Sequence, residues 1–349
     1  MNDPFEDAFH ERSVKTVLSL MSMCRRKRIR KREADMRKNI WIDTDPGIDD
    51  AIAIAAAFAS SDRLRILGIS TVAGNQTIDI VTKNALWLRE ILGGKDVSVV
   101  RGAPRPLIRR PHPVGSVHGV HGLGYVVPEE TGRIPDSDQG AANISRCIQE
   151  LPEGEKITIV PIGPLTNIAL LIRACPDAAR RIDKIVLMGG SSVEGNITAT
   201  AEYNIWADPE AAEIVFQSGI PIVMCGLDVT MKCLLSMEDI LTLENGGALQ
   251  KQFARMLQFY FDSTAYQGKG YVAMHDSVPF LYLLHEELFS GQQHIVHVSC
   301  TEDTCRGMTV VCDAPYTYQP VDEPKNVFIV KNVDSGAFRR ELMDRLMSL

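Results

Sequence analysis

The sequence predicts an α/β fold, with a doubly wound, mostly parallel sheet and helices on both faces. Short apolar runs rich in Val and Ile alternate with segments of helical periodicity from residue 39 onward. Strands that alternate with helices form βαβ units, in which the strands lie parallel. Glycine-rich polar segments follow several of the runs, and such sheets bind ligands at the carboxyl ends of their strands. We therefore expect a site on these loops.

The elements follow from this alternation in chain order. An apolar run predicts a strand at 40–43, and the alanine-rich segment after it predicts a helix at 49–60. The same reasoning predicts strands at 64–71, 98–101, 157–161, 184–188 and 221–226, and helices at 77–92, 141–150, 164–174 and 209–217. The length of 349 residues allows one large α/β domain or two smaller ones.

The bulk properties exclude several classes of protein. The formal net charge of −7 gives no general attraction to nucleic acid, so we expect no nucleic-acid partner. No apolar run reaches the length needed to cross a bilayer, and we expect no membrane partner. Eight scattered cysteines without a CxxC pair predict reduced thiols in a cytoplasmic protein.

Residues 1–38 differ in composition from the rest of the chain. They contain a dense basic block at 25–32 and no periodicity that supports a strand or a helix. A tether to nucleic acid or to an anionic surface is one interpretation. We favour a mobile extension without a structural role, or translation assigned upstream of a true start at Met36.

The segment DTDPGIDD, residues 43–50, joins the first strand to the first helix. Side chains two apart on a strand point the same way, so Asp43 and Asp45 project together. A Pro-Gly turn then places Asp49 and Asp50 at the start of the helix, where the helix dipole favours acidic residues. We expect the four carboxylates to converge. Without a cation they would repel one another, and an all-oxygen set favours Ca²⁺ or Mg²⁺; a capped, solvated turn is the alternative.

Amides and acids occupy the loops after the later strands. Asn75 follows the second strand, and Asn196, Glu202 and Asn204 follow the strand at 184–188. Each residue alone is typical of a turn or a helix cap. Together, at one edge of the sheet, they supply donors and acceptors for several hydroxyl groups in fixed directions, as a sugar presents them.

Two further segments carry titratable residues. The long segment 102–140, rich in glycine and proline, is interpreted as a flap over the site, in which His118 either contacts the substrate or is solvated. His275 and Asp276 open a later predicted helix. Asp276 either caps that helix or completes a metal site formed by distant segments.

These motifs, in this order, resemble the inosine-uridine preferring nucleoside hydrolases, and within that family the bacterial ribohydrolases of broad purine and pyrimidine range. The resemblance runs from Asn39 to the C-terminus. It implies one catalytic domain over 39–349 that cleaves ribonucleosides, binds Ca²⁺ tightly and forms a homodimer or homotetramer. The motifs that carry it are residues 43–50, 72–75, 188–190, 195–196, 202–204 and 275–276.

The resemblance also assigns roles to residues of this chain. Asp45, Asp50 and Asp276 would hold the calcium ion, together with the backbone carbonyl of Ile162, where many members have threonine. The implied contacts to ribose hydroxyls come from Asp49, Asn75, Asn196, Glu202 and Asn204, with Met188 packed on the sugar and His118 near the base. Asp43 would orient its neighbours. Val120-His121 depart from the family pattern and leave the base preference open.

The mechanistic hypothesis is hydrolysis of the N-glycosidic bond through an oxocarbenium-like transition state. Asp45 would act as general base on a calcium-bound water, and His275 as the acid for the departing base. For pyrimidines the flap, or an aromatic helix containing Tyr260 and Tyr266, is another route. Two alternatives stay open: a Mg²⁺-dependent phosphohydrolase of the haloacid-dehalogenase type, and a non-catalytic calcium-dependent nucleoside-binding protein.

Overall fold

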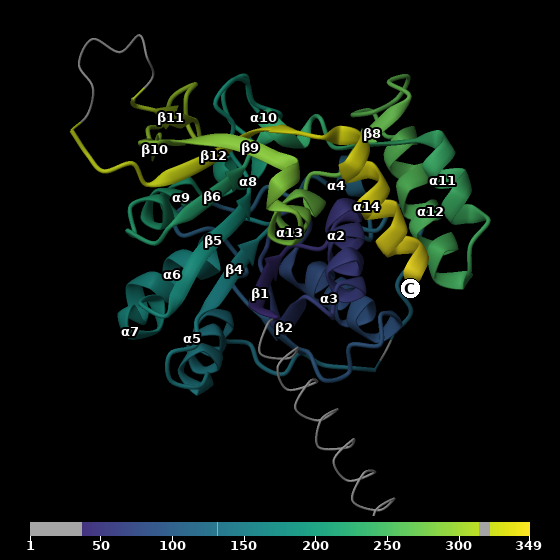
Figure 1. Ribbon diagram of the computed structural model, residues 1–349, viewed down its shortest axis with the longest axis horizontal. Helices are drawn as coiled ribbons and strands as arrows, with labels where there is room; N and C mark the ends of the chain where they lie inside the picture. Colours follow the sequence, from purple (N-terminus) through teal and green to yellow (C-terminus); the bar gives the residue numbers. More distant parts are fainter. Residues whose placement is uncertain (1–36, 131, 314–321) are drawn as a thin grey trace, which may run out of the picture. The chain divides into compact units, whose positions relative to one another are not determined.

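The computed structural model describes residues 37–130, 132–313 and 322–349 (Figure 1). Residues 39–349 form one compact unit. The basic block of the sequence lies outside the described residues. In the described part, no helix has both the length and the apolar character that a transmembrane span requires.

An eight-stranded sheet runs through this unit, and its strand order is β3-β2-β1-β4-β5-β6-β12-β9. The pairs β2–β3, β1–β4, β4–β5, β5–β6 and β6–β12 are parallel, and β12 and β9 are antiparallel. The chain winds outward from β1 in one direction and from β4 in the other, so β1 and β4 flank the topological switch point. The strands are β1 (Lys38–Thr44), β2 (Leu64–Thr71), β3 (Ser98–Arg101), β4 (Ile157–Pro161), β5 (Ile182–Met188), β6 (Ile222–Cys225), β9 (Phe289–His294) and β12 (Val327–Val333).

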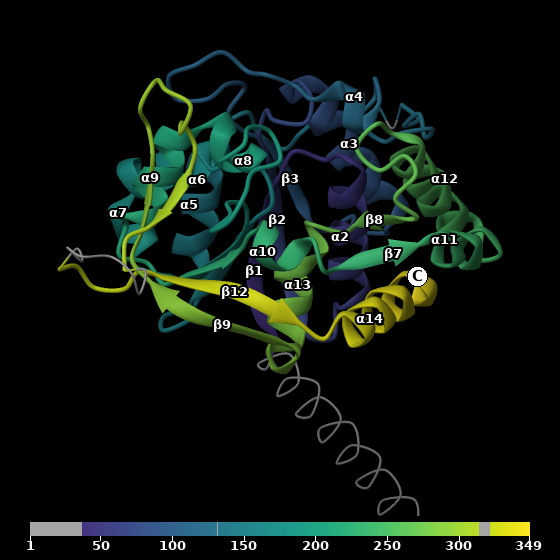
Figure 2. The ribbon, with the colours of Figure 1, turned by 90° about the horizontal axis from the view of Figure 1, so that it is seen from above.

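The two faces of the sheet pack against different helices (Figure 2). Ile40 and Ile42 of β1 face one core, and Trp41 between them faces the other, as strand alternation requires. The first core includes α2 (Ile48–Ala59), α3 (Ile78–Ile91), α11 (Met237–Glu244), α12 (Ala248–Asp262), α13 (Ser277–Leu284) and α14 (Ser335–Ser348). The second includes α5 (Gly140–Glu150), α6 (Thr166–Ala174), α7 (Pro176–Ala179) and α9 (Pro209–Phe216).

Short elements complete the fold and lie mostly near the carboxyl ends of the strands. They are α4 (Gly115–His118), α8 (Tyr203–Ala207), α10 (Leu227–Thr230), the 3-10 helix η1 (Glu286–Leu288), the strand pair β7 (Leu234–Ser236) and β8 (Tyr271–Ala273), and the strand pair β10 (Val296–Val298) and β11 (Thr309–Val311). Each pair forms an antiparallel ribbon apart from the main sheet.

The predicted fold class is confirmed, and every predicted element exists within two residues of its expected bounds. One expectation is wrong: α12 ends at Asp262, so Tyr260 lies on a helix but Tyr266 lies in the turns beyond it. The helix ends there because Ser263 adopts an extended backbone and the following segment contains two glycines with positive φ, Gly268 and Gly270.

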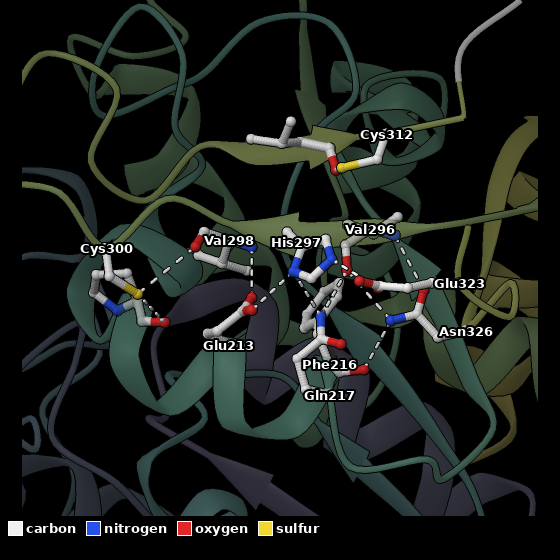
Figure 3. A network of polar contacts seen from close by, with 12 residues as sticks. Glu213, Phe216, Gln217, Val296, His297, Val298, Cys300, Cys312, Glu323 and Asn326 are labelled. Atoms are coloured by element: carbon white, nitrogen blue, oxygen red, sulfur yellow. Dashed lines mark hydrogen bonds and ion pairs between the residues drawn. The ribbon is translucent and has the colours of Figure 1, made fainter. Parts of the chain in front are cut away.

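The hairpin formed by residues 296–311, which we name the arm, packs its first strand on α9 (Figure 3). Its His297 bridges two acids, with Nδ1 at 3.0 Å from Oε1 of Glu213 and Nε2 at 3.0 Å from Oε2 of Glu323. The backbone N–H of Val298 donates to the other oxygen of Glu213 at 2.7 Å. The base of the arm is thus fixed to α9 by one carboxylate that accepts two hydrogen bonds.

Replacing His297 by Gln is expected to lower stability in a pH-dependent way. The hydrogen bond with Glu213 is the main cause that raises the pKa of His297 above 6.5. Because the pKa of His297 is higher in the folded than in the unfolded protein, its protonation stabilises the folded state. This stabilisation is complete below the unfolded pKa of about 6.5 and is lost as pH rises through the folded pKa. Because His297 is partly exposed, the effect is about 1 kcal/mol or less. Thermal melts from acidic to alkaline pH should show a deficit largest at the acidic end; a pH-independent deficit would contradict this.

Candidate active site

A pocket of about 630 Å³ opens at the carboxyl ends of the parallel strands, at the switch point. The first turn of α2 and the loops that follow β2, β4 and β5 all contribute to its wall. Ten of the twelve residues singled out from the sequence line it: Asp49, Asn75, His118, Ile162, Met188, Asn196, Glu202, Asn204, His275 and Asp276. The other two, Asp45 and Asp50, are fully buried and contact Asn75, which does line the pocket.

Three carboxylates converge beside this wall. Asp49, Asp50 and Asp276 each place an oxygen within 4.8 Å of the others, and all three are buried. Asp49 and Asp50 are held by the first turn of α2, where Asp50 also accepts a hydrogen bond from the Gly47 N–H at 2.9 Å. Asp276 precedes α13, but its side chain makes no capping hydrogen bond. Asp276 was expected either to cap this helix or to complete a metal site. The structure does not show the capping role.

Asp45 lies next to this cluster with one carboxylate oxygen unengaged. Its Oδ2 accepts the backbone N–H of Asn75 at 2.6 Å, whereas Oδ1 is buried and has no hydrogen-bond partner among the described residues. Gly74 and Gly163 surround the carboxylate so closely that a Cβ at either position would collide with an Asp45 oxygen. The glycines of two loops thus make room for a buried acid with an oxygen free for a ligand.

The acidic cluster carries an electrostatic cost that a cation would offset. Burial, and then repulsion by Asp50, raises the pKa of Asp49 to about 8 and that of Asp45 well above its usual range. Burial and repulsion by Asp49 also raise the pKa of Asp276. A hard divalent cation would favour the charged carboxylates, and an all-oxygen set that includes an orphaned oxygen suits it. The residues therefore fit a Ca²⁺ or Mg²⁺ ion.

Asp43 does not join the cluster, which corrects the expectation that four motif carboxylates converge. Its Oδ1 accepts the Asn167 amide at 2.8 Å and the hydroxyl of Ser70, which in turn accepts the Trp41 indole N–H at 2.9 Å. The physical reason is that β1 ends at Thr44, so Asp45 has left the strand and no longer points with Asp43. The distant Asp276 takes the expected place.

The polar residues of the β5–α8 loop, residues 189–202, and of α8 form another part of the wall. The Glu202 carboxylate caps α8 by accepting the N–H groups of Asn204 and Ile205, and it also accepts that of Gly190 at 3.0 Å. Burial raises its pKa to about 7. Asn204 donates to the carbonyls of Ile162 and of Met188, at 3.1 and 3.2 Å. One short helix therefore sets the positions of the acid, the amide and the carbonyl of Ile162.

His118 of the flap is fixed over the turn of the acidic motif. Its Nδ1 accepts the Ile48 N–H at 3.1 Å, and burial lowers its pKa to about 3. The ring is thus neutral with its proton on Nε2, a hydrogen-bond donor. A Cβ at Gly47 would lie 2.6 Å from Nδ1, so this close approach requires glycine. His118 lines the pocket and is buried, so it is not the solvated loop histidine of the alternative interpretation.

His275 is held between two hydroxyl groups. Its Nδ1 is 2.8 Å from the Thr230 hydroxyl, and its Nε2 is 3.0 Å from the Tyr266 hydroxyl. The Tyr266 ring packs edge-on against the ring of Tyr260, with centroids 4.8 Å apart, and burial and the charge of Asp49 raise the pKa of Tyr260. Burial lowers the pKa of His275 to about 4, so the ring is neutral near pH 7. This differs from the expectation of a histidine that titrates near neutrality, because burial disfavours the charged ring.

Several residues of the site were not found from the sequence. Thr44 donates to Asp50 at 2.6 Å, and Thr230 holds His275. Both had a signal, because Thr44 lies inside the acidic motif and Thr230 follows the strand β6. Asp228, which lines the pocket and accepts the Ser192 N–H at 2.9 Å, follows the same strand.

Comparison with known proteins agrees with this geometry. The non-specific ribonucleoside hydrolase RihC of Escherichia coli is 38% identical over 310 residues, covering 87% of this chain and 97% of the relative. The pyrimidine-specific ribonucleoside hydrolase RihA of Escherichia coli is 39% identical over 311 residues, covering 88% and 97%. The solved plant nucleoside hydrolase PpNRh1 superposes with a TM-score of 0.83 at 30% identity, covering 89% of this chain and 99% of its own.

The family description of the inosine-uridine preferring nucleoside hydrolases matches residues 40–340. This range begins inside β1 and ends inside α14, so it includes the other seven strands of the main sheet, most of β1, and every residue that lines the pocket. The chain belongs to the inosine-uridine preferring nucleoside hydrolase family.

Proposed function

We propose that this protein hydrolyses the N-glycosidic bond of ribonucleosides, both purine and pyrimidine, to free base and ribose. The observation that carries the proposal is the pocket itself, in which a cluster of buried carboxylates faces amides and acids suited to several hydroxyls. The relatives named as ribonucleoside hydrolases support the same activity. No observation favours the phosphohydrolase or the non-catalytic binding protein.

Asp45, Asp50 and Asp276 would hold a Ca²⁺ ion, with the carbonyl of Ile162 as a further ligand. The orphaned Oδ1 of Asp45 and the convergence of Asp50 with Asp276 support this assignment. When bound, the ion would supply positive charge that fixes ribose hydroxyls and lowers the pKa of a nearby water. Thr44, which donates to Asp50, would hold that carboxylate in place.

Ribose would be held by two polar parts of the pocket wall. Asp49 and Asn75 belong to the part of the wall next to Asp50, and Asn196, Glu202 and Asn204 belong to the part formed by the β5–α8 loop and α8. Asn196 uses its Oδ1 to accept the Tyr203 N–H at 2.9 Å, which leaves its NH₂ group for a hydroxyl acceptor. Met188 lines the pocket and would pack on the sugar. Such fixed contacts orient the anomeric carbon toward its nucleophile.

Asp45 would act as general base. The carboxylate accepts the Asn75 N–H through one oxygen, and this bond holds it so that the other oxygen is available to accept a proton from the attacking water. The charge that develops on ribose in the transition state is positive. The neighbouring Asp49 would stabilise that charge, because it lines the pocket and is too buried for solvent to screen it.

The departing base would be assisted by two histidines. His275 is proposed to deliver a proton together with Tyr266, whose hydroxyl is 3.0 Å from its Nε2. Because the His275 ring is neutral near pH 7, we infer that it orients the Tyr266 hydroxyl, which would donate a hydrogen bond to the departing base. The Nε2–H of His118 would donate to a carbonyl or ring nitrogen of the base.

The range of bases is tested by measuring reducing-sugar release from inosine, adenosine, uridine and cytidine. We expect ribose from at least one purine and one pyrimidine nucleoside. A relative of broad specificity and one of pyrimidine specificity are equally similar, so identity alone does not select the base. Phosphate release from a phosphomonoester would support the phosphohydrolase, and nucleoside binding without any ribose would support the binding protein.

We also place the protein in the cytoplasm and expect a homodimer or homotetramer. The seven cysteines in the described residues are free thiols, as a reducing compartment requires. Light scattering after size-exclusion chromatography measures the assembly directly.

A further inference from the structure

We propose that the arm positions the ribose-binding wall and that Thr309 is the positioning residue through which it does so. This inference rests on the proposed function, because it concerns how the β5–α8 loop presents its side chains to the sugar. Thr309 is not among the residues that line the pocket. It acts through Ser191, which lines the pocket.

The contact between Thr309 and Ser191 uses both capacities of one hydroxyl. The Thr309 Oγ1 accepts the backbone N–H of Ser191 at 2.9 Å and donates to the carbonyl of the same residue. Both residues are buried, with 3% and 4% of their surfaces exposed. A side-chain hydroxyl here satisfies two backbone groups just beyond the end of β5, where no strand pairs with the chain.

The same threonine also sets the position of the residue that binds Glu202. A Cβ on Gly190 would lie 2.9 Å from the Thr309 Cγ2, so the two residues are in close contact. Gly190 has a φ of +77°, a conformation that glycine adopts without cost, and its N–H donates to Oε2 of Glu202 at 3.0 Å. Thr309, Gly190 and Glu202 thus form a connected path from the arm to the wall.

The arm holds the end of the β5–α8 loop as well as its start. The Thr200 hydroxyl donates to the carbonyl of Thr304 at 3.1 Å. Gly307 lies against Trp206 of α8, where a Cβ would be 2.6 Å from the Trp206 Cα. Asn196 lies between these fixed points, so its place in the pocket depends on both.

The arm is itself anchored independently of the site. Arg306 donates to both carboxylate oxygens of Glu210 on α9 at 2.8 Å, and His297 and Val298 bind Glu213 one turn further along the helix (Figure 3). Both bonds to Glu210 come from Nη2, while Nη1 donates to the Cys300 carbonyl at 2.9 Å, so the guanidinium links the arm to α9 through charge-assisted bonds. The arm therefore transmits the position of a packed helix to a loop that has no regular structure of its own.

The test compares Thr309→Val with Thr309→Ser and with Thr301→Val, an exposed arm threonine whose hydroxyl contacts only Ser299 and Asp303 among the described residues. Valine keeps the shape of threonine and removes both hydrogen bonds, whereas serine keeps the hydroxyl. Steady-state ribose release and a thermal melt are measured for each. For Thr309→Val we expect KM to rise about 10-fold or more with kcat little changed, because ground-state contacts to ribose are displaced.

The two controls should behave like the wild type. Thr309→Ser should restore most of the loss, and Thr301→Val should leave KM unchanged. A purely structural role for Thr309 would lower the folded fraction, which reduces apparent kcat and the melting temperature without moving KM. That result, or a wild-type KM for Thr309→Val, would overturn the inference.

Thr200→Val serves as a second variant if Thr309→Val does not fold, since Thr200 is only partly buried. Loss of the Thr200 hydroxyl should raise KM about 3-fold, because it frees the end of the β5–α8 loop. An unchanged KM would count against the positioning role of the arm. The two hypotheses fail in different ways. A wild-type protein that releases no ribose overturns the proposed function, whereas an active wild type with variants of unchanged KM overturns only the positioning role.

Discussion

Replacement of Asp45 by Asn is expected to lower the rate of ribose release by about 10³-fold while leaving the fold intact. Asparagine has the shape of aspartate and its carbonyl oxygen still accepts the Asn75 N–H, so the cradle formed by Gly74 and Gly163 is kept. What is lost is the oxygen that is proposed both to bind the ion and to accept a proton from water. Steady-state kinetics with uridine and a circular-dichroism melt measure the two parts of this prediction.

The melt has a definite expected direction. In metal-free protein, Asn at position 45 removes one of several buried, mutually repelling acids, so the melting temperature should equal or exceed that of the wild type. Asp183→Asn is the matched control, because Asp183 is an exposed acid on β5, away from the pocket. Near-normal ribose release by the Asp45 variant would contradict its role as general base.

Removal of calcium is expected to abolish ribose release and to lower the melting temperature by several degrees. A ligand that binds only the folded state stabilises it by about 2.7 kcal/mol when present at 100 times its dissociation constant. In the metal-free protein, burial and like charge raise the pKa values of Asp49 and Asp276. A bound cation would relieve this repulsion, so the stabilisation by calcium should depend on the acidic cluster. Activity assays and melts with a chelator, and then with Ca²⁺ restored, measure both effects.

The variant Asp276→Asn tests whether calcium acts by binding at the acidic cluster or elsewhere on the protein. This variant removes a proposed ligand that makes no capping bond to α13, so the helix should persist. Isothermal titration with Ca²⁺ should show affinity lowered by at least about 10-fold. If Ca²⁺ raises the melting temperature of the variant as much as that of the wild type, Asp276 does not hold the ion.

Much of the fold could be predicted because strand and helix periodicities differ along the first two thirds of the chain. The run at 40–43 and the alanine-rich helix after it are unambiguous, and the structure places them at β1 and α2. β9 was missed because its sequence, FSGQQH, is polar and lies at the edge of the sheet, where only one side is covered. An edge strand of this kind gives little hydrophobic signal.

The site was predictable where residues cluster in sequence or follow a strand. Asp49, Asn75 and Glu202 all lie at strand ends or helix starts, and topology alone brings them together. The sequence could not show which carboxylates join the cluster and which do not. That depends on β1 ending at Thr44, one residue before Asp45. Local alternation describes a strand but does not say where the strand stops.

Thr309 had no signal in the sequence at all. It is 118 residues from Ser191, and it lies in an antiparallel ribbon outside the main sheet. The neutral state of His275 was equally hidden, because burial by distant segments sets its pKa. Long-range packing of this kind decides positions and protonation states that periodicity does not encode.

The measurement that tests the central claim most directly is the joint quantification of uracil and reducing sugar released from uridine by the purified calcium-loaded protein in phosphate-free buffer. Hydrolysis of the N-glycosidic bond predicts equal amounts of the two products and no requirement for phosphate. Uracil released only when phosphate is added, without reducing sugar, would show transfer to phosphate in place of water. Release of neither product from uridine or from inosine would contradict the ribohydrolase assignment.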